Sequence, residues 1–264
     1  MTVVFGAIAP HGDPAFVDGS PTRLAFEELG RRVERASPEV TIVLTPHNVH
    51  VEGAFAVLTA ATLSGSLDGL PVELECRVER TLAAEVVGTL RTAGIPAVSV
   101  SYGSNDETLA VMPLDWGALI PLWFLGGRDE DPRPVVVVSP ARDLPLADHV
   151  RAGAAIARAS AQRDVAVIAS ADHGHAHDAN GPFGFHPASA EYDRRVVELV
   201  RENRLGDLRE LESIVSAASA DSLWQMAMLD GALGDGFTAE LLSYERPTYF
   251  GMLCAAFEPR VLAT

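Results

Sequence analysis

The sequence has few cysteines, few aromatic residues and no long uninterrupted apolar run. Its two cysteines, Cys76 and Cys254, lie far apart and share no ligand-type spacing, which argues against a disulfide framework or a cysteine-rich zinc site. The most apolar segment, residues 118–127, contains Pro121 and is far too short to span a bilayer, and the N-terminus lacks the basic start of a signal peptide. We therefore expect a soluble, cytoplasmic protein with no membrane partner.

Positive charge is also scarce relative to negative charge. The chain has 20 Lys+Arg against 36 Asp+Glu, a formal net charge of −16 and a pI near 4.8. Such a chain repels a phosphate backbone at long range, so nucleic acid is not an expected partner. With 264 residues, 48% of them hydrophobic, and no linker-like segment, the sequence predicts a single domain over residues 1–264 with a large core.

Short β-rich runs bounded by turn residues recur along the chain. They cover residues 3–8, 40–44, 72–78, 97–100, 135–138, 165–169 and 249–257. Several of these runs are apolar at consecutive positions, which is typical of central strands covered by helices on both faces.

Helical periods lie between these runs. In the first of them, Phe26, Leu29 and Val33 share one face, and Ser20 with Pro21 forms a typical helix start. Strands that alternate with helices predict an α/β fold. We expect one domain with a mostly parallel or mixed central sheet, helices on both faces, and an antiparallel strand near the C-terminal end.

Most histidines directly follow a predicted strand. His11 and His47 each follow a proline at a strand end, and a third strand leads into residues 172–177, Asp-His-Gly-His-Ala-His. In an open α/β sheet, ligands bind at the carboxyl ends of the strands, where these side chains would gather. Two imidazoles and one carboxylate form the facial triad of non-haem Fe(II) enzymes. Spacing alone does not identify such a site, because a single histidine after a strand is more often a loop residue.

Five segments, taken in order, resemble a known family. They are Pro10-His11-Gly12, Thr45-Pro46-His47, residues 169–175, Glu191-Tyr192-Asp193-Arg194 and Leu242-Ser243-Tyr244-Glu245. Together they resemble the class III extradiol ring-cleavage dioxygenases, whose type member is the catalytic subunit of protocatechuate 4,5-dioxygenase, and also the related Memo-like proteins. The resemblance runs from residue 6 to about residue 257.

The resemblance implies a ligand set and a catalytic base. His11, His47 and Glu245 would bind a single Fe(II), and His175 would act as the acid/base in the cleavage of a catechol-like or 2-aminophenol-like substrate by O2. Judged by its neighbours alone, Glu245 is better explained as an ion-paired surface carboxylate. His173 and His177 are the alternatives to His175, with a structural or substrate-contact role if they are not the base.

The chain departs from the family at Trp116. It has Asp-Trp-Gly at residues 115–117 where family members commonly have Asp-His-Gly. A tryptophan cannot relay a proton, although it can cover an aromatic substrate or lie in the core. Further candidates for substrate contact or for orienting the ligand imidazoles are residues close to them in sequence or motif: Asp13, Asn48, His50 and Tyr244.

Other functions and partners remain open at this point. A Memo-like binding protein would use the same fold without ring cleavage, and a zinc hydrolase could use the same ligand set. The resemblance also implies a homo-oligomer or a complex with a small second subunit. Four arginines are candidates for binding a carboxylate on an aromatic substrate, with a solvated side chain as the alternative: Arg128, Arg142, Arg194 and Arg246.

Overall fold

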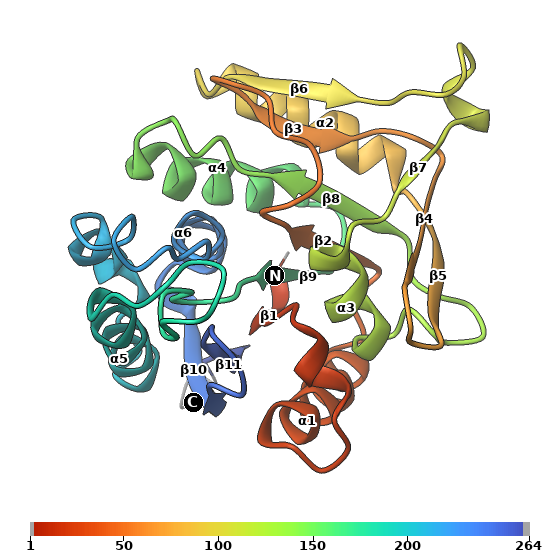
Figure 1. Ribbon diagram of the computed structural model, residues 1–264. Coiled ribbons are helices and arrows are strands. Elements are labelled where there is room, and N and C mark those ends of the chain that lie inside the picture. Colours follow the sequence, from red (N-terminus) through yellow and green to blue (C-terminus); the bar gives the residue numbers. More distant parts are fainter. Residues whose placement is uncertain (1–2, 261–264) are drawn as a thin grey trace.

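Strands and helices alternate through much of the chain in the computed structural model, which describes residues 3–260 (Figure 1). The strands are β1 (Val3–Ala9), β2 (Val40–Leu44), β3 (Phe55–Leu58), β4 (Thr62–Leu67), β5 (Val72–Arg77), β6 (Ala97–Val100), β7 (Val111–Pro113), β8 (Val135–Ser139), β9 (Val165–Ser170), β10 (Phe237–Glu245) and β11 (Met252–Pro259). The α-helices are α1 (Pro21–Ala36), α2 (Arg80–Thr92), α3 (Trp116–Phe124), α4 (Leu146–Ala159), α5 (Ala188–Arg201) and α6 (Leu223–Leu233). Short 3-10 helices are η1 (Asp13–Phe16), η2 (Glu107–Leu109), η3 (Leu205–Leu211) and η4 (Gly234–Gly236). Within the described residues, none of the helices has the length and apolar character needed to cross a membrane.

A large mixed sheet with the strand order β10-β11-β1-β9-β2-β8-β3-β6 forms the centre of the fold. Strands β1, β9, β2 and β8 are parallel neighbours. On either side of them, β11 pairs antiparallel with β1, and β3 pairs antiparallel with β8. The predicted α/β class, the mixed central sheet and the antiparallel strand near the C-terminal end are therefore confirmed.

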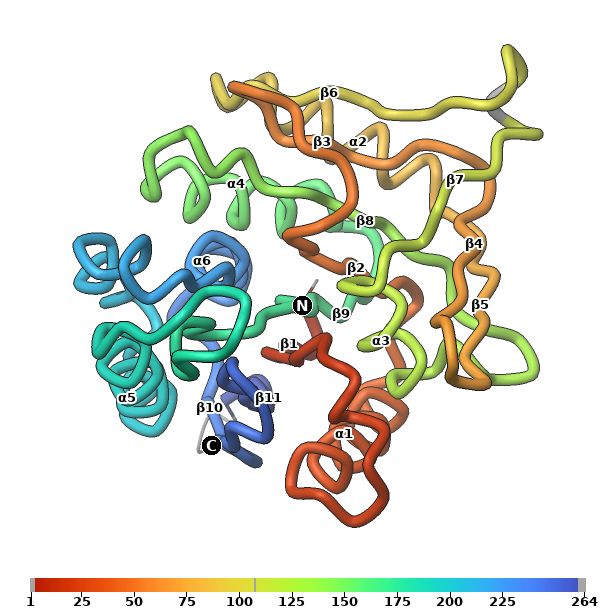
Figure 2. The backbone as a smooth tube through the Cα atoms, viewed as in Figure 1, coloured from red at the N-terminus to blue at the C-terminus, as the bar shows by residue number. Residues whose placement is uncertain are grey.

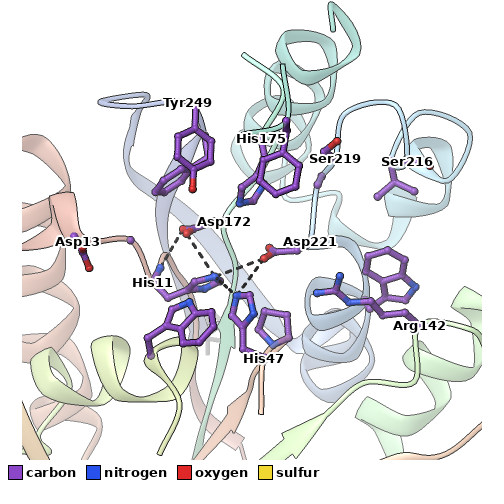
Figure 3. A pocket seen from close by; sticks show the side chains of 18 residues that line it. His11, Asp13, His47, Arg142, Asp172, His175, Ser216, Ser219, Asp221 and Tyr249 are labelled. Atoms are coloured by element: carbon purple, nitrogen blue, oxygen red, sulfur yellow. Dashed lines mark hydrogen bonds and ion pairs between the residues drawn. The ribbon is translucent and has the colours of Figure 1, made fainter. Parts of the chain in front are cut away.

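The four parallel strands lie side by side in the middle of the molecule (Figure 2). The loops at their carboxyl ends carry His11 after β1, His47 after β2, Arg142 after β8 and Asp172 after β9. All four of these residues line one cavity (Figure 3). The parallel arrangement thus brings together side chains that are far apart in the sequence.

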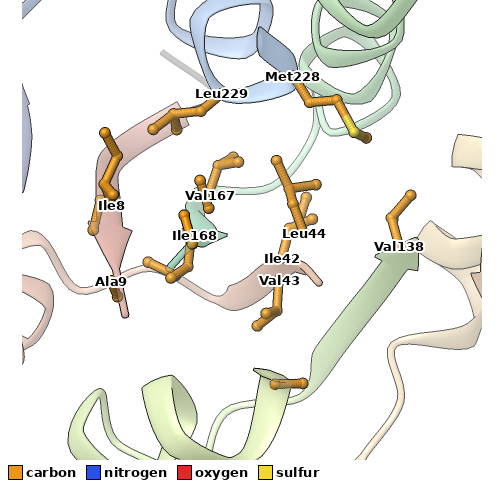
Figure 4. Packing of buried hydrophobic residues seen from close by; sticks show 14 of the residues in the cluster. Ile8, Ala9, Ile42, Val43, Leu44, Val138, Val167, Ile168, Met228 and Leu229 are labelled. Carbon is orange, nitrogen blue, oxygen red and sulfur yellow. The ribbon is translucent and has the colours of Figure 1, made fainter. Parts of the chain in front are cut away.

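The central strands of the main sheet are buried on both faces. Helix α6 packs over β1 and β9 on one face and contacts α4, whereas α1 and α3 pack on the other. In Figure 4, Leu44 and Val167 point toward Met228 and Leu229 of α6, while Val43 and Ile168 point to the opposite face. Both sets are fully buried, which explains why these strands are apolar at most positions.

A second, three-stranded sheet with the order β5-β4-β7 lies beside the main one (Figure 1). The predicted strand at residues 72–78 forms β5 of this small sheet, and its side chains alternate between buried and exposed. The sequence interpretation omitted β3, β4, β7 and β10. In β4 the reason is the local sequence Thr-Leu-Ser-Gly-Ser-Leu, because serine and glycine are typical of turns.

Candidate metal centre

His11 and His47 meet at the carboxyl edge of the main sheet. His11 lies two residues after β1, and His47 lies three residues after β2. Their Nε2 atoms are 2.9 Å apart, and their rings are nearly perpendicular, at 86°. If both nitrogens are unprotonated, their lone pairs converge on one small volume, which is the arrangement that metal binding by imidazoles requires.

A carboxylate from a distant part of the chain completes this group. Asp221 lies two residues before α6, and its Oδ2 is 3.6 Å from His11 Nε2 and 3.5 Å from His47 Nε2 (Figure 3). One ligand atom from each residue lies within 4.8 Å of the other two. The second oxygen of Asp221, Oδ1, is buried and has no hydrogen-bond partner within the described part of the chain. An unpaired buried oxygen is costly, so this donor set fits a cation. We refer to His11, His47 and Asp221 as the ligand group.

Ser170 fixes the tautomer of His11. His11 Nδ1 lies 2.9 Å from Ser170 Oγ, and the Ser170 hydroxyl donates a hydrogen bond to the carbonyl oxygen of Gly117. Because a carbonyl oxygen can only accept, the hydroxyl hydrogen is already used, and Ser170 Oγ must accept from His11 Nδ1–H. The neutral His11 ring therefore directs the lone pair of Nε2 toward the rest of the ligand group. Metal-binding histidines are commonly oriented by this type of hydrogen bond.

The charges around the ligand group favour a bound cation. Burial alone would lower the pKa of His11, but the carboxylates of Asp172 and Asp221 outweigh it and raise this pKa. Burial and the facing His11 ring lower the pKa of His47 to about 4, so His47 is neutral at pH 7. Burial opposes ionisation of Asp221, but the neighbouring imidazoles reverse this effect and lower its pKa. The buried carboxylates thus attract positive charge to the place where the imidazole nitrogens meet.

Glu245, the third ligand that the family resemblance implies, does not lie beside His11 and His47 in the structure. Glu245 ends β10 and lies outside the cavity and the ligand group. Its Oε1 accepts a hydrogen bond of 2.8 Å from the backbone N–H of Thr22, in the first turn of α1. The free N–H groups and the dipole of a helix N-terminus attract a carboxylate, which explains this position. The carboxylate beside the two imidazoles is Asp221.

His175 lies across the cavity from the ligand group (Figure 3). The cavity has a volume of about 790 Å³, which is within the range of small-molecule sites. The His175 ring stacks on Phe250 with ring centroids 5.3 Å apart, and Phe183 contacts its edge at 5.4 Å. Its Nδ1 is buried and has no hydrogen-bond partner among the described residues. An imidazole in this position can exchange a proton with a molecule bound in the cavity.

The two alternative histidines of the same segment have structural partners instead. His173 is fully buried, and its Nδ1 lies 3.0 Å from Ser222 Oγ. His177 Nε2 lies 2.8 Å from Asp193 Oδ2. Neither histidine is among the residues that line the cavity. Of the three histidines in this segment, His175 is therefore the one placed to act on a bound molecule.

Asp193 organises the loop that carries His175. Its Oδ1 accepts a hydrogen bond of 2.7 Å from the backbone N–H of Gly174, and its Oδ2 accepts one of 2.7 Å from the Tyr244 hydroxyl. The same Oδ2 contacts His177. Tyr244, a candidate for substrate contact or for orienting the ligand imidazoles, contacts this loop through Asp193.

Trp116 is at the mouth of the cavity and not in the core. It is the first residue of α3, 51% of it is exposed, and its ring centroid lies 4.4 Å from that of His47. Asn48 Nδ2 donates a hydrogen bond of 2.9 Å to Asp115 Oδ2, and Asp115 caps α3 by accepting from the N–H of Ala118. Asn48 thus fixes the start of the helix that places Trp116 over His47.

Asp13 and His50, the last two candidates for substrate contact or for orienting the ligand imidazoles, differ in their position relative to the cavity. Asp13 is exposed and lines the cavity, so it can contact a bound molecule. His50 is exposed and is not among the residues that line the cavity. The structure gives His50 no contact with the ligand group.

The sequence interpretation assigned no role to Asp221 or Asp172. Asp172 lies two residues after β9, and its Oδ1 accepts a hydrogen bond of 3.0 Å from the backbone N–H of His11, so the strand-end pattern could have identified it. Asp221 precedes a helix and follows no strand, so that pattern could not have found it.

Replacing Ser170 with alanine is expected to weaken metal binding by about 10- to 100-fold, because the His11 ring loses the partner that fixes its tautomer. Metal titration of the purified variant measures this loss. Ser139→Ala is the matched control, because Ser139 is also buried at the end of a parallel strand but lies outside the ligand group. An equal loss of affinity in both variants would contradict the assigned role of Ser170.

Residues 9–254 match a family model described as the catalytic LigB subunit of aromatic ring-opening dioxygenase. This range covers nearly the whole chain and includes the ligand group and His175. The chain therefore belongs to the LigB family, which confirms the resemblance seen in its motifs. Members of this family use a non-haem metal, and the ligand group is a set of side chains that could bind one.

Two individual proteins show further similarity. Protein CA_C1420 of Clostridium acetobutylicum is 24% identical over 232 residues, which cover 85% of this chain and 49% of that protein. The chain thus spans about half the length of this curated relative. The crystal structure of an uncharacterized protein, JW3007 from Escherichia coli K12, matches 96% of this chain and 99% of its own chain with a TM-score of 0.67 and 15% identity. This structural likeness shows a shared fold.

Proposed function

We propose that this protein is a non-haem, Fe(II)-dependent extradiol dioxygenase that cleaves the aromatic ring of a catechol-like or 2-aminophenol-like substrate with O2. The observation that supports this proposal most directly is that the ligand group and His175 face each other across one cavity. Membership of the LigB family gives independent support. We propose that residues 1–264 act as one catalytic domain.

The ligand group would hold the metal through three side chains. His11 and His47 would contribute Nε2, and Asp221 would contribute its carboxylate. Two imidazoles and one carboxylate suit Fe(II). When bound, the metal would provide adjacent positions for the two substrate oxygens and for O2, and would make the substrate hydroxyls more acidic.

His175 would accept the proton that a substrate hydroxyl loses on binding and return it later in the reaction. Imidazoles exchange protons near neutral pH, which suits both roles. The ring is held by its stacking on Phe250, which is buried, so its orientation toward the cavity is fixed before a substrate binds.

The aromatic side chains of the cavity suit a flat substrate. Phe183, Tyr249 and Phe250 surround His175 on one side, and Trp116 covers His47 on the other. Ring contacts of this kind contribute about 0.5–1.5 kcal/mol each beyond the area that they bury. They would also keep water away from the reacting atoms.

Oxygen consumption by the metal-loaded protein tests the proposal. We expect Fe(II)-loaded protein to consume O2 when catechol, 2-aminophenol or their carboxylated derivatives are added, and to form a yellow ring-opened product. An oxygen electrode and absorption spectroscopy measure both signals. A broad panel of these substrates with neither signal would contradict the proposal. Ester hydrolysis by the zinc-loaded protein without O2 uptake would indicate a hydrolase, and ligand binding without either reaction would indicate a Memo-like binding protein.

The partners in this proposal are a small aromatic substrate and O2. A homo-oligomer, or a complex with a small second subunit, and a cytoplasmic location stay predictions. The molar mass of the purified chain, measured by light scattering, would show whether it forms a homo-oligomer.

A further inference from the structure

Helix α3 begins beside the ligand group, at the carboxyl edge of the main sheet. Its N-cap is Asp115, and its first two residues are Trp116 and Gly117. The Trp116 ring lies against the His47 ring, with centroids 4.4 Å apart. We refer to residues 115–117 as the α3 start. Its other contacts reach the loop after β2 and the end of β9, the two segments that set the orientation of the imidazole ligands.

Asp115 joins the α3 start to the loop that carries His47. Thr45 is fully buried, and its hydroxyl donates a hydrogen bond of 2.7 Å to Asp115 Oδ1. Thr45 Oγ1 in turn accepts a hydrogen bond of 3.3 Å from the backbone N–H of His47. Directly after His47, Asn48 Nδ2 donates a hydrogen bond of 2.9 Å to Asp115 Oδ2. The two carboxylate oxygens of Asp115 therefore hold this loop on both sides of the imidazole.

Gly117 joins the same turn to His11. Its carbonyl oxygen accepts the hydrogen of the Ser170 hydroxyl. Ser170 Oγ is thus left to accept from His11 Nδ1–H, and the lone pair of His11 Nε2 points toward the rest of the ligand group. Three consecutive residues therefore act on both imidazoles, although β1 and β2 carry these imidazoles on separate loops.

The α3 start approaches the His47 loop so closely that position 117 has no room for a side chain. A Cβ added at Gly117 would lie 2.6 Å from Thr45 Oγ1, 2.8 Å from Asp115 Oδ1 and 3.1 Å from His47 Cδ2. A larger residue would therefore push against the Thr45–Asp115 hydrogen bond and against the imidazole ring. Because the two segments are in direct contact, a shift of the α3 start has to move His47.

We propose that Asp115 is a positioning residue that, through the α3 start, fixes the orientation of both His11 and His47 for metal binding. This inference rests on the metal-binding part of the proposed function and not on ring cleavage. Two imidazoles bind one ion tightly when their lone pairs already converge, because no loop then has to be ordered on binding. Asp115 does not belong to the ligand group, so its effect on the metal is indirect.

Replacing Asp115 with asparagine tests this inference. The new amide presents N–H donors to Asn48 or to Thr45, which are themselves donors, so at least one hydrogen bond is lost. We expect the affinity for Fe(II), measured by anaerobic titration, to fall by about 10- to 100-fold, the usual effect of losing a group that orients a ligand. The visible absorption of bound Co(II) depends on its coordination geometry and should change as well. Unchanged affinity and an unchanged Co(II) spectrum would overturn the inference.

Two substitutions at Thr45 separate the hydrogen bond from the shape of the side chain. Thr45→Val has a similar size but no hydroxyl, so it should weaken metal binding as Asp115→Asn does. Thr45→Ser keeps the hydroxyl and should restore most of the affinity. Equal losses in the valine and serine variants would make packing the cause and would contradict the role of Asp115.

Ser20→Ala is the matched control for the loss of a helix cap. Ser20 Oγ caps α1 by accepting a hydrogen bond from the Arg23 N–H, and Ser20 does not line the cavity. This variant should lower the midpoint of thermal unfolding, as Asp115→Asn does, and keep the metal affinity of the unmodified protein. A similar loss of affinity in Ser20→Ala would reduce the effect of Asp115 to general stability and would reject the positioning role.

A double variant tests whether both imidazoles depend on the same turn. If Asp115→Asn displaces the α3 start, the Gly117 carbonyl moves away from Ser170. The tautomer of His11 is then already released, so Ser170→Ala should cost less affinity in the Asp115→Asn protein than in the unmodified protein. Fully multiplicative losses would show that the two imidazoles are held independently and would overturn the shared role.

Oxygen consumption by the same preparations separates this inference from the proposed dioxygenase. Metal binding that depends on Asp115, in a protein that consumes no O2 with any catechol or 2-aminophenol, would uphold the positioning role and reject the dioxygenase. Ring cleavage by an Asp115→Asn protein with unchanged metal affinity would uphold the dioxygenase and reject the positioning role.

Discussion

Replacing Asp221 with asparagine is expected to lower metal affinity by more than about 100-fold, which is beyond the usual effect of losing a group that only supports a ligand. Asparagine keeps the size of the side chain but removes the negative charge that would hold a cation beside His11 and His47. Elemental analysis after dialysis should therefore show a metal content close to zero, compared with about one metal ion per chain in the unmodified protein.

Glu245→Gln is the control for this experiment, because the family resemblance pointed to Glu245 as the third ligand. In the structure, Glu245 accepts a hydrogen bond from the Thr22 N–H at the start of α1. We expect this variant to keep its metal and to lose about 0.5–1.5 kcal/mol of unfolding free energy, measured by denaturant titration. Loss of metal from Glu245→Gln, together with retention in Asp221→Asn, would show that the ligand group is wrong.

Replacing His175 with alanine is expected to reduce turnover by about 10²- to 10⁴-fold, the usual cost of removing a general acid/base. Metal should remain bound, because His175 does not belong to the ligand group. Steady-state O2 consumption and metal analysis on the same preparation measure both quantities. The effect should appear in kcat/KM as well as in kcat, because His175 would accept a proton when the substrate binds and return it during the reaction.

His50→Ala provides the comparison for the His175 variant. His50 is exposed and lies outside the cavity, so its removal should leave turnover and metal content unchanged. Loss of metal from His175→Ala would instead make His175 a ligand. Full turnover in His175→Ala would require another proton acceptor, and Asp172, whose pKa burial raises to about 6, would be the next residue to test.

Much of the fold could be predicted because its central strands are buried on both faces. Strands β2, β8 and β9 have no exposed residue, so their apolar runs are continuous and their boundaries are clear in the sequence. The start of α1 was also predicted correctly, because serine is a preferred N-cap residue. In the structure Ser20 Oγ accepts a hydrogen bond from the Arg23 N–H. Strand β10 was not predicted, because it mixes exposed and half-buried residues at the sheet edge.

The candidate site could be predicted only in part, because only some of its residues follow a recognisable strand. His11, His47 and His175 follow buried strands. Predicting these strands therefore also places the three histidines at the carboxyl edge of the sheet. The family resemblance then selected Glu245 by its place in a motif, but the N-terminus of α1 binds that carboxylate. No local pattern distinguishes Asp221 from the other acidic residues of the chain.

The sequence by itself determined the α/β class, the family and the edge of the sheet where the imidazoles lie. These properties follow from local patterns of burial and from motifs a few residues long. Only the tertiary structure decided which carboxylate lies beside His11 and His47, which histidine faces them, and that Arg142 lines the same cavity. Which side chains lie together in the cavity depends on distances between segments far apart in the chain. Those distances are set by how helices and loops pack around the sheet.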